Sequence, residues 1–116
     1  MADKSNKFVL EVPLDASGIK DFKPDRSIKV VAYNRQGATV SSGVAEFDKN
    51  GNGRATLGFK ENPGGVRVVV GPDSASEEDL KYLQTLSVNV TASQLKEGTN
   101  GISAIVITPY YWDWWI

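Results

Sequence analysis

The 116-residue chain contains no cysteine and no histidine. Without cysteine it has no disulfides, no thiolate-bound zinc or iron–sulfur cluster, and no thiol nucleophile. Without histidine it lacks the commonest metal ligand, the commonest general base and every histidine-dependent catalytic triad. These two absences exclude most familiar catalytic and metal-binding classes, and we expect no cofactor.

An excess of charge of one sign is also missing. The 13 Lys and Arg residues are balanced by 14 Asp and Glu residues, which leaves a net charge of −1. Proteins that bind nucleic acid through bulk electrostatics carry a clear basic excess. We therefore expect no nucleic-acid partner.

Long apolar runs are absent as well. The first apolar stretch, Phe8–Leu10, ends at Glu11. A secretory signal needs about 7–15 apolar residues, and a membrane-spanning helix needs about 20. We therefore expect no signal peptide and no membrane span, and a cytoplasmic protein if Met1 is the native start.

The length of 116 residues is typical of one domain. A chain of this size buries roughly two thirds of its extended surface on folding, enough for a core without metal or disulfide. We expect one domain over residues 1–108, followed by an aromatic tail or connector over 109–116.

Short alternations of apolar and polar residues, separated by Gly, Asn, Asp and Pro, dominate the chain. They predict seven strands, at residues 7–12, 28–33, 39–47, 54–60, 66–70, 86–91 and 102–108. This spacing is typical of a sandwich and predicts an all-β fold, a seven-stranded immunoglobulin- or prealbumin-like β-sandwich. The residues that we expect in its core are Leu10, Val30, Ala32, Phe47, Leu57, Val68, Val88 and Ile105 or its neighbours.

One segment, near residues 75–84, breaks the strand pattern. Ser74 and Glu77 have the spacing of a capping box, and Glu77 and Lys81 form a favourable i,i+4 pair. Acidic residues fill the first turn, where the helix dipole stabilises them. We predict a helix of about two to three turns here, with Leu80 and a second leucine three residues later as its apolar stripe.

Two turn-containing segments resemble a known group of domains. Residues 33–40 (YNRQGATV) and 47–57 (FDKNGNGRATL) are similar to the strands and turns of transthyretin-like β-sandwiches, which include the carboxypeptidase regulatory-like domains. The resemblance covers residues 28–70. It implies a β-sandwich without enzymatic activity and gives this chain no catalytic residue.

The C-terminal segment 107–115 resembles the aromatic connector that joins such an N-terminal sandwich to a further β-domain in some bacterial multidomain proteins. This resemblance implies a structural module from a larger bacterial protein. It also implies that the aromatic segment lies against another domain.

The turn Asp48–Gly53 matches the first half of a calcium loop. Calcium would need oxygen ligands at its first, third and fifth positions, which are Asp48, Asn50 and Asn52, and a bidentate Glu at the twelfth. The twelfth position is Phe59, in an expected strand. A hairpin turn accounts for the same residues and is preferred, with a weak calcium site as the alternative.

The last residues hold an unusual density of aromatic rings. Five of the 11 aromatic residues of the chain lie within six positions: Tyr110, Tyr111, Trp112, Trp114 and Trp115. One interpretation is an extended tail that packs alternate rings on its own sandwich. A second is a contact surface for a following domain, another subunit or a second copy, since Trp and Tyr anchor protein interfaces. The remaining two are stacking of a carbohydrate ring and a position at a membrane interface.

No pattern predicts catalysis. The run Glu77–Asp79 suits a helix start rather than an acid–base pair, and nothing places a second acid opposite it. The sequence therefore predicts a non-enzymatic structural or protein-interaction module that docks a partner through its aromatic C-terminal strip. The alternative is a carbohydrate-binding module in which Trp112, Trp114 or Trp115 stacks on a sugar.

Overall fold

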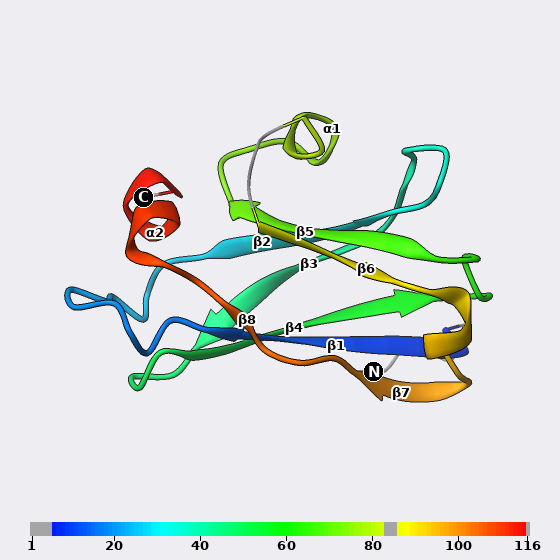
Figure 1. Ribbon diagram of the computed structural model, residues 1–116, viewed down its shortest axis with the longest axis horizontal. Helices are drawn as coiled ribbons and strands as arrows, with labels where there is room; N and C mark the ends of the chain where they lie inside the picture. Colours follow the sequence, from blue (N-terminus) through cyan, green and yellow to red (C-terminus); the bar gives the residue numbers. More distant parts are fainter. Residues whose placement is uncertain (1–5, 83–85, 116) are drawn as a thin grey trace.

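A computed structural model describes residues 6–82 and 86–115 as one mostly β structure with two short α-helices (Figure 1). Its strands within these residues are β1 (Phe8–Asp15), β2 (Ile28–Tyr33), β3 (Thr39–Phe47), β4 (Asn52–Phe59), β5 (Val66–Pro72), β6 (Leu86–Val90), β7 (Gly98–Gly101) and β8 (Ile105–Val106). The helical segments are α1 (Glu77–Leu80), the 3-10 turn η1 (Ala92–Gln94) and α2 (Pro109–Trp115). Within the described ranges, no helix has the length and apolar character needed to cross a membrane.

The strands form one mixed sheet in the order β6-β5-β2-β3-β4-β1-β7, and β8 also pairs with β1. The pairings of β1 with β7 and with β8 are parallel, and the others are antiparallel. The all-β class is confirmed, and the first six expected strands appear with shifts of a few residues at their ends.

The seventh expected strand, over residues 102–108, is confirmed only in part. The structure has β7 before this range and only Ile105–Val106 as strand within it. β7 has no apolar alternation and is held by backbone pairing with β1 and by Asn100, whose amide donates to the Val9 carbonyl at 3.1 Å. Hydrophobic patterning does not detect such a strand, because its side chains add nothing to the core.

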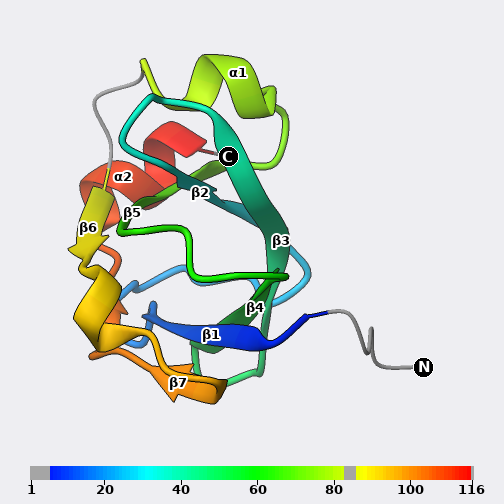
Figure 2. The ribbon, with the colours of Figure 1, turned by 90° about the vertical axis from the view of Figure 1, so that its right-hand side faces the viewer.

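β3 turns the sheet back on itself. Its residues 39–45 pair with β2, whereas Glu46 and Phe47 pair with β4. The half made of β2, β5 and β6 therefore lies over the half made of β1, β4 and β7, as two views at right angles show (Figure 1 and Figure 2). The main hydrophobic core fills the space between these halves.

Most of the expected core is buried, with Leu10, Val30, Ala32, Leu57 and Val68 each fully enclosed. Phe47, Val88 and Ile105 are half-buried and pack against the core from its margin, whereas Ile107, a neighbour of Ile105, is buried in the core. These three side chains are only half-buried because of their positions in the sheet. Phe47 lies at the end of β3, Val88 lies on β6 at the end of the strand order, and Ile105 lies on the two-residue β8.

Helix α1 covers the outer face of the half made of β2, β5 and β6, which we call the upper half. There Val31, Tyr33 and Val69 form a second buried cluster with Leu80 of α1. The helix approaches β5 so closely that a Cβ on Gly71 would overlap a methyl carbon of Leu80. Glycine at this position therefore lets the helix rest directly on the sheet.

The expected helix near 75–84 is shorter than predicted. It comprises Glu77–Leu80, and its N-cap is Ser76, whose hydroxyl accepts from the Asp79 N–H at 3.0 Å, rather than Ser74. Lys81 pairs with Glu78 at 3.3 Å instead of Glu77, because the helix ends before the i,i+4 geometry is complete. The second leucine of the expected stripe, Leu83, lies outside the described residues.

Candidate functional site

The aromatic tail is helical, so the interpretation of it as an extended tail is wrong. Helix α2 starts at Pro109, a residue favoured in the first turn, and the Thr108 carbonyl accepts from the Trp112 N–H at 3.1 Å. An extended tail would alternate its rings between two faces, whereas a helix aligns residues three and four apart. Helix formation therefore sorts four of the five rings into a buried and an exposed pair and leaves Tyr111 between them.

The inner side of α2 is part of the core. Trp112 is 1% exposed and Trp115 is 7% exposed. Trp112 packs between Phe22, in the loop after β1, and Phe47, with ring centroids 5.1 and 5.9 Å away. These two indoles hold the helix against the end of the curled sheet and, in this conformation, present no open face to a ligand.

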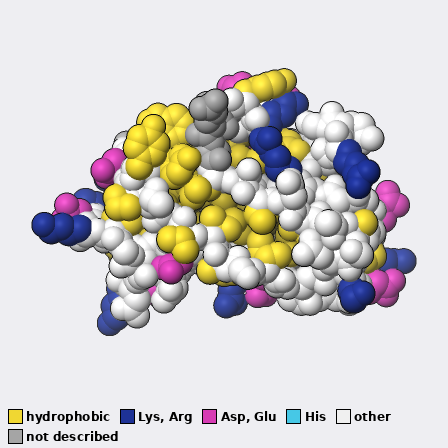
Figure 3. Space-filling view, in the orientation of Figure 1, with side chains coloured by type: hydrophobic (Ala, Val, Ile, Leu, Met, Phe, Trp, Pro, Cys, Tyr) yellow, Lys and Arg dark blue, Asp and Glu magenta, His cyan; other side chains and the backbone are white. Residues whose placement is uncertain are grey.

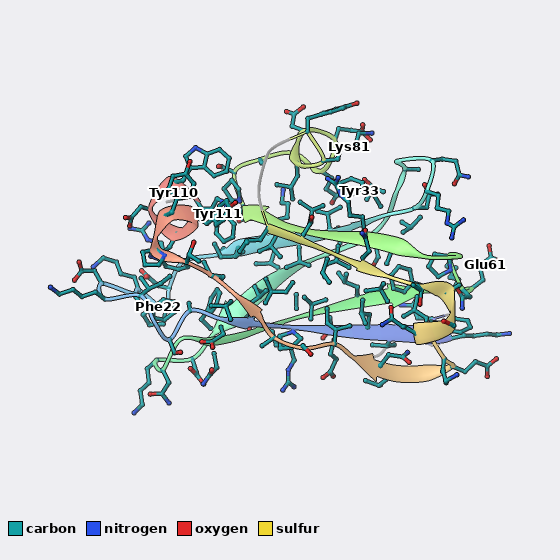
Figure 4. The ribbon with its side chains drawn as sticks, in the orientation of Figure 1. Phe22, Tyr33, Glu61, Lys81, Tyr110 and Tyr111 are labelled. Atoms are coloured by element: carbon teal, nitrogen blue, oxygen red, sulfur yellow. The ribbon has the colours of Figure 1, made fainter. Side chains whose placement is uncertain are left out.

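The outer side of α2 faces solvent. Tyr110 and Trp114, four residues apart and hence on one face, are 75% and 51% exposed. Tyr111 is half-buried between the two sides, with its ring 5.8 Å from that of Trp115 and 5.3 Å from that of Tyr110. Figure 4 shows Tyr110 and Tyr111 on α2 at one end of the molecule.

The loop after β3 is a hydrogen-bonded hairpin turn. One carboxylate oxygen of Asp48 accepts from the N–H groups of Asn50 and Asn52 at 2.8 and 3.0 Å. Gly51 has a φ of 87°, which the turn requires and which side chains rarely adopt. The turn interpretation accounts for all these residues, and calcium binding by Asp48, Asn50 and Asn52 stays a prediction.

Sequence reasoning missed a cavity on the outer face of the upper half. The register places Tyr33, Arg67 and Asn89 in one row across β2, β5 and β6. The adjacent row contains Val31 and Val69, which α1 covers. Because α1 ends after four residues, the first row stays open as the floor of a cavity of about 630 Å³.

The walls of this cavity are cationic. Arg35 in the β2–β3 turn and Lys81 after α1 join Arg67, and no Asp or Glu among the described residues lines it. Arg67 donates to the Lys81 carbonyl at 3.0 Å, and the Lys81 ammonium donates to the Gly37 carbonyl at 3.0 Å. These contacts fix the end of α1 against the turn that follows β2.

Tyr33 occupies the boundary between the cavity and α1. Its hydroxyl donates to the Glu77 carbonyl, which ties the first turn of α1 to the sheet. Burial raises the pKa of Tyr33 above its usual value; the Arg67 charge lowers it and the Glu77 and Glu78 carboxylates raise it by smaller amounts. The phenol therefore stays protonated at neutral pH and acts as a hydrogen-bond donor.

The cavity residues come from four separate segments, so no local motif marks them. The only available signal is that Arg67 and Asn89 interrupt valine-rich strands at positions facing away from the core. Within the part of the chain that the structure describes, no group of three or more Asp or Glu residues could hold a metal ion. The chain matches no family model, no curated protein and no solved structure.

Proposed function

We propose that this protein is a non-catalytic protein-interaction module whose docking surface is the outer side of α2. The observation that carries the proposal is the exposure of Tyr110 and Trp114 on a helix whose other tryptophans are locked in the core. Rings of this size are unfavourable in water, and Tyr and Trp dominate the binding energy of protein interfaces.

The apolar surface extends beyond the helix. Val106 of β8, four residues before Tyr110, is 60% exposed. Figure 3 shows hydrophobic side chains over α2 and across the middle of the same face of the molecule. Exposed apolar surface that forms a continuous area marks interaction sites more often than scattered residues do.

The occupant that we propose is a second copy of the chain. A two-fold contact requires a surface that is complementary to itself. The neutral rings of Tyr110 and Trp114 meet this requirement at the centre of the contact. The exposed Asp113 beside them lies at its solvated rim, so that the two carboxylates are not placed opposite one another. A rigid helix held by Trp112 and Trp115 also presents these rings without loss of backbone entropy on binding.

We also propose that the curled sheet is a transthyretin- or immunoglobulin-like β-sandwich. The crossing of β3 from one half to the other and the Asp48–Gly53 hairpin support this assignment. Such domains present loops and ends of strands for recognition, which agrees with a docking surface at one end of the sheet.

Sedimentation velocity over a wide concentration range tests the docking surface. The unmodified chain should associate as concentration rises, and the double variant Tyr110→Ser/Trp114→Ser should remain monomeric. Val44→Ser is the matched control, because Val44 is 48% exposed on the part of β3 that pairs with β2. A chain that is monomeric throughout contradicts docking of a second copy. Quenching or a shift of Trp114 fluorescence by polysaccharides would favour carbohydrate binding instead.

A further inference from the structure

We propose that the cationic cavity between α1, the β2–β3 turn and the ends of β5 and β6 binds a small phosphorylated molecule that also carries hydroxyl groups. This binding site is separate from α2 and does not depend on the proposed docking function. Its volume of about 630 Å³ falls within the range of about 300–1,000 Å³ that small-molecule sites occupy.

The charge of the cavity selects an anion. Three cationic side chains line it in a protein whose net charge is −1. Lys81 is partly neutralised by Glu78 at 3.3 Å, outside the lining, whereas Arg35 and Arg67 form no ion pair within the described residues. Two guanidinium groups with free charge therefore face one cavity.

Guanidinium groups favour phosphate in particular. Each presents parallel N–H donors that match two oxygens of a phosphate, and the charge makes these hydrogen bonds stronger than neutral ones. One N–H of Arg67 is held by the Lys81 carbonyl at 3.0 Å, which fixes the side chain in the cavity and leaves other donors for a ligand. Arg67 is thus already oriented before a ligand arrives.

The rest of the lining suits a hydroxyl-bearing molecule. Asn89 lies beside Arg67 in the floor of the cavity, and Gln36 adds a second amide to its lining. Thr91 adds a hydroxyl that donates to Gln94 Oε1 at 3.1 Å and therefore serves as an acceptor for a ligand. Amides and hydroxyls both donate and accept, as sugar hydroxyls do. The exposed ring of Tyr82, 5.3 Å from the Lys81 ammonium, offers a flat face for a sugar or a base.

Figure 4 shows Tyr33 and Lys81 near each other on the outer side of β5, close to α1. In Figure 3 dark blue Lys and Arg side chains gather at the same upper edge of the molecule, apart from most of the hydrophobic atoms over α2. The cavity and the docking surface therefore occupy different regions, and each can be altered without changing the other.

Binding is tested by NMR titration of the isotope-labelled chain with four probes: inorganic phosphate, glucose 6-phosphate, adenosine monophosphate and glucose. We expect shifts at the backbone amides of the cavity with the phosphorylated probes and none with glucose at equal concentration. Stronger binding of glucose 6-phosphate or of the nucleotide tells a sugar phosphate from a nucleotide. Equal shifts with glucose, shifts outside the cavity, or no shifts with any probe would overturn the proposal.

Variants locate the interaction. Arg35→Gln removes a guanidinium that forms no side-chain hydrogen bond within the described residues and should weaken binding of the better phosphorylated probe by at least about tenfold, the usual effect of losing one charge-assisted contact. Arg67→Gln should weaken binding by a similar factor. Because Arg67 also donates to the Lys81 carbonyl after α1, Arg67→Lys serves as a second variant, which keeps the charge but loses the paired N–H donors. Arg54→Gln is the control, because Arg54 pairs with Glu11 on the opposite half. Equal affinity in all variants would refute the assignment.

Discussion

The indole ring of Trp112 lies 5.1 Å from the ring of Phe22, which joins the C-terminal helix to the loop between β1 and β2. Phe47, at the end of β3, completes the cluster at 5.4 Å from Phe22. These three rings come from distant parts of the chain and close one end of the curled sheet. The helix that presents the proposed docking surface is therefore also part of the core.

Replacement of Trp112 tests this role. Trp112→Ala should lower the free energy of unfolding by about 3–5 kcal/mol, because it leaves a cavity among the aromatic rings. Trp112→Phe should cost clearly less, since the indole N–H has no hydrogen-bond partner among the described residues and a ring still fills the site. Trp114→Ala should cost less than about 1 kcal/mol, because Trp114 is 51% exposed.

Urea denaturation followed by circular dichroism measures all three variants. Equal losses for Trp112→Ala and Trp114→Ala would contradict the division of α2 into a buried and an exposed side. The same comparison decides which residues can be altered in the association experiment without unfolding the protein.

The aromatic tail shows which properties of the candidate site can be predicted from the sequence and which cannot. The density of rings between Tyr110 and Trp115 identified the segment, but the one interpretation that specified its conformation, an extended tail, is wrong. The choice between strand and helix depends on contacts with Phe22 and Phe47, which lie more than 60 residues away in the chain. A local pattern contains no information about those partners.

The hairpin at Gly51 could be predicted from the sequence, because Asn-Gly pairs are a strong local signal of a tight turn. The structure adds a tertiary contact: the Gly51 carbonyl accepts from the Ala16 N–H at 2.7 Å. A Cβ at Gly51 would lie 2.8 Å from the backbone of Ala16 and Ser17. Only the folded arrangement shows that this turn also supports the loop after β1.

Gly51→Ala should therefore destabilise the protein more than Gly64→Ala. Both glycines have positive φ, 87° and 79°, so both variants lose about 1–2 kcal/mol from backbone strain. A Cβ at Gly64 meets no atom within 4 Å, whereas at Gly51 the clash adds about 1–3 kcal/mol. Thermal or urea unfolding of the two variants measures the difference, and equal stabilities would contradict the contact.

The cavity could not be predicted from the sequence, because its residues are brought together only by the fold. Arg35, Arg67 and Lys81 are far apart in the chain and look like ordinary surface residues. They converge because the sheet register sets Tyr33 opposite Arg67 and because α1 stops at Leu80. Register and helix length are set by packing on both faces of β2 and β5.

Alkaline pH tests the environment of Tyr33. Because burial raises its pKa in the folded state, the contribution of Tyr33 to stability is complete below its unfolded pKa of about 10 and is lost as the pH rises through the folded value. The unmodified chain should lose stability above about pH 10 more steeply than Tyr33→Phe, which has no phenol to ionise. Unfolding curves at several alkaline pH values measure this. Parallel pH profiles would contradict the protonated, buried phenol.

Acidic pH tests the turn that ends β1. Hydrogen bonds from the Ser17 hydroxyl at 2.6 Å and the Ser17 N–H at 2.9 Å lower the pKa of Asp15. In Ser17→Ala only the backbone donor remains, so the pKa of Asp15 should rise part of the way to its usual value. A carboxyl whose pKa is lowered by folding stabilises the folded state above its unfolded pKa of about 4, and this contribution is lost as the pH falls through the folded pKa. The stability difference between the unmodified chain and Ser17→Ala should therefore vanish at low pH. NMR titration of the Asp15 carboxyl in both proteins measures the shift; an unchanged Asp15 pKa would show that the hydroxyl contributes nothing.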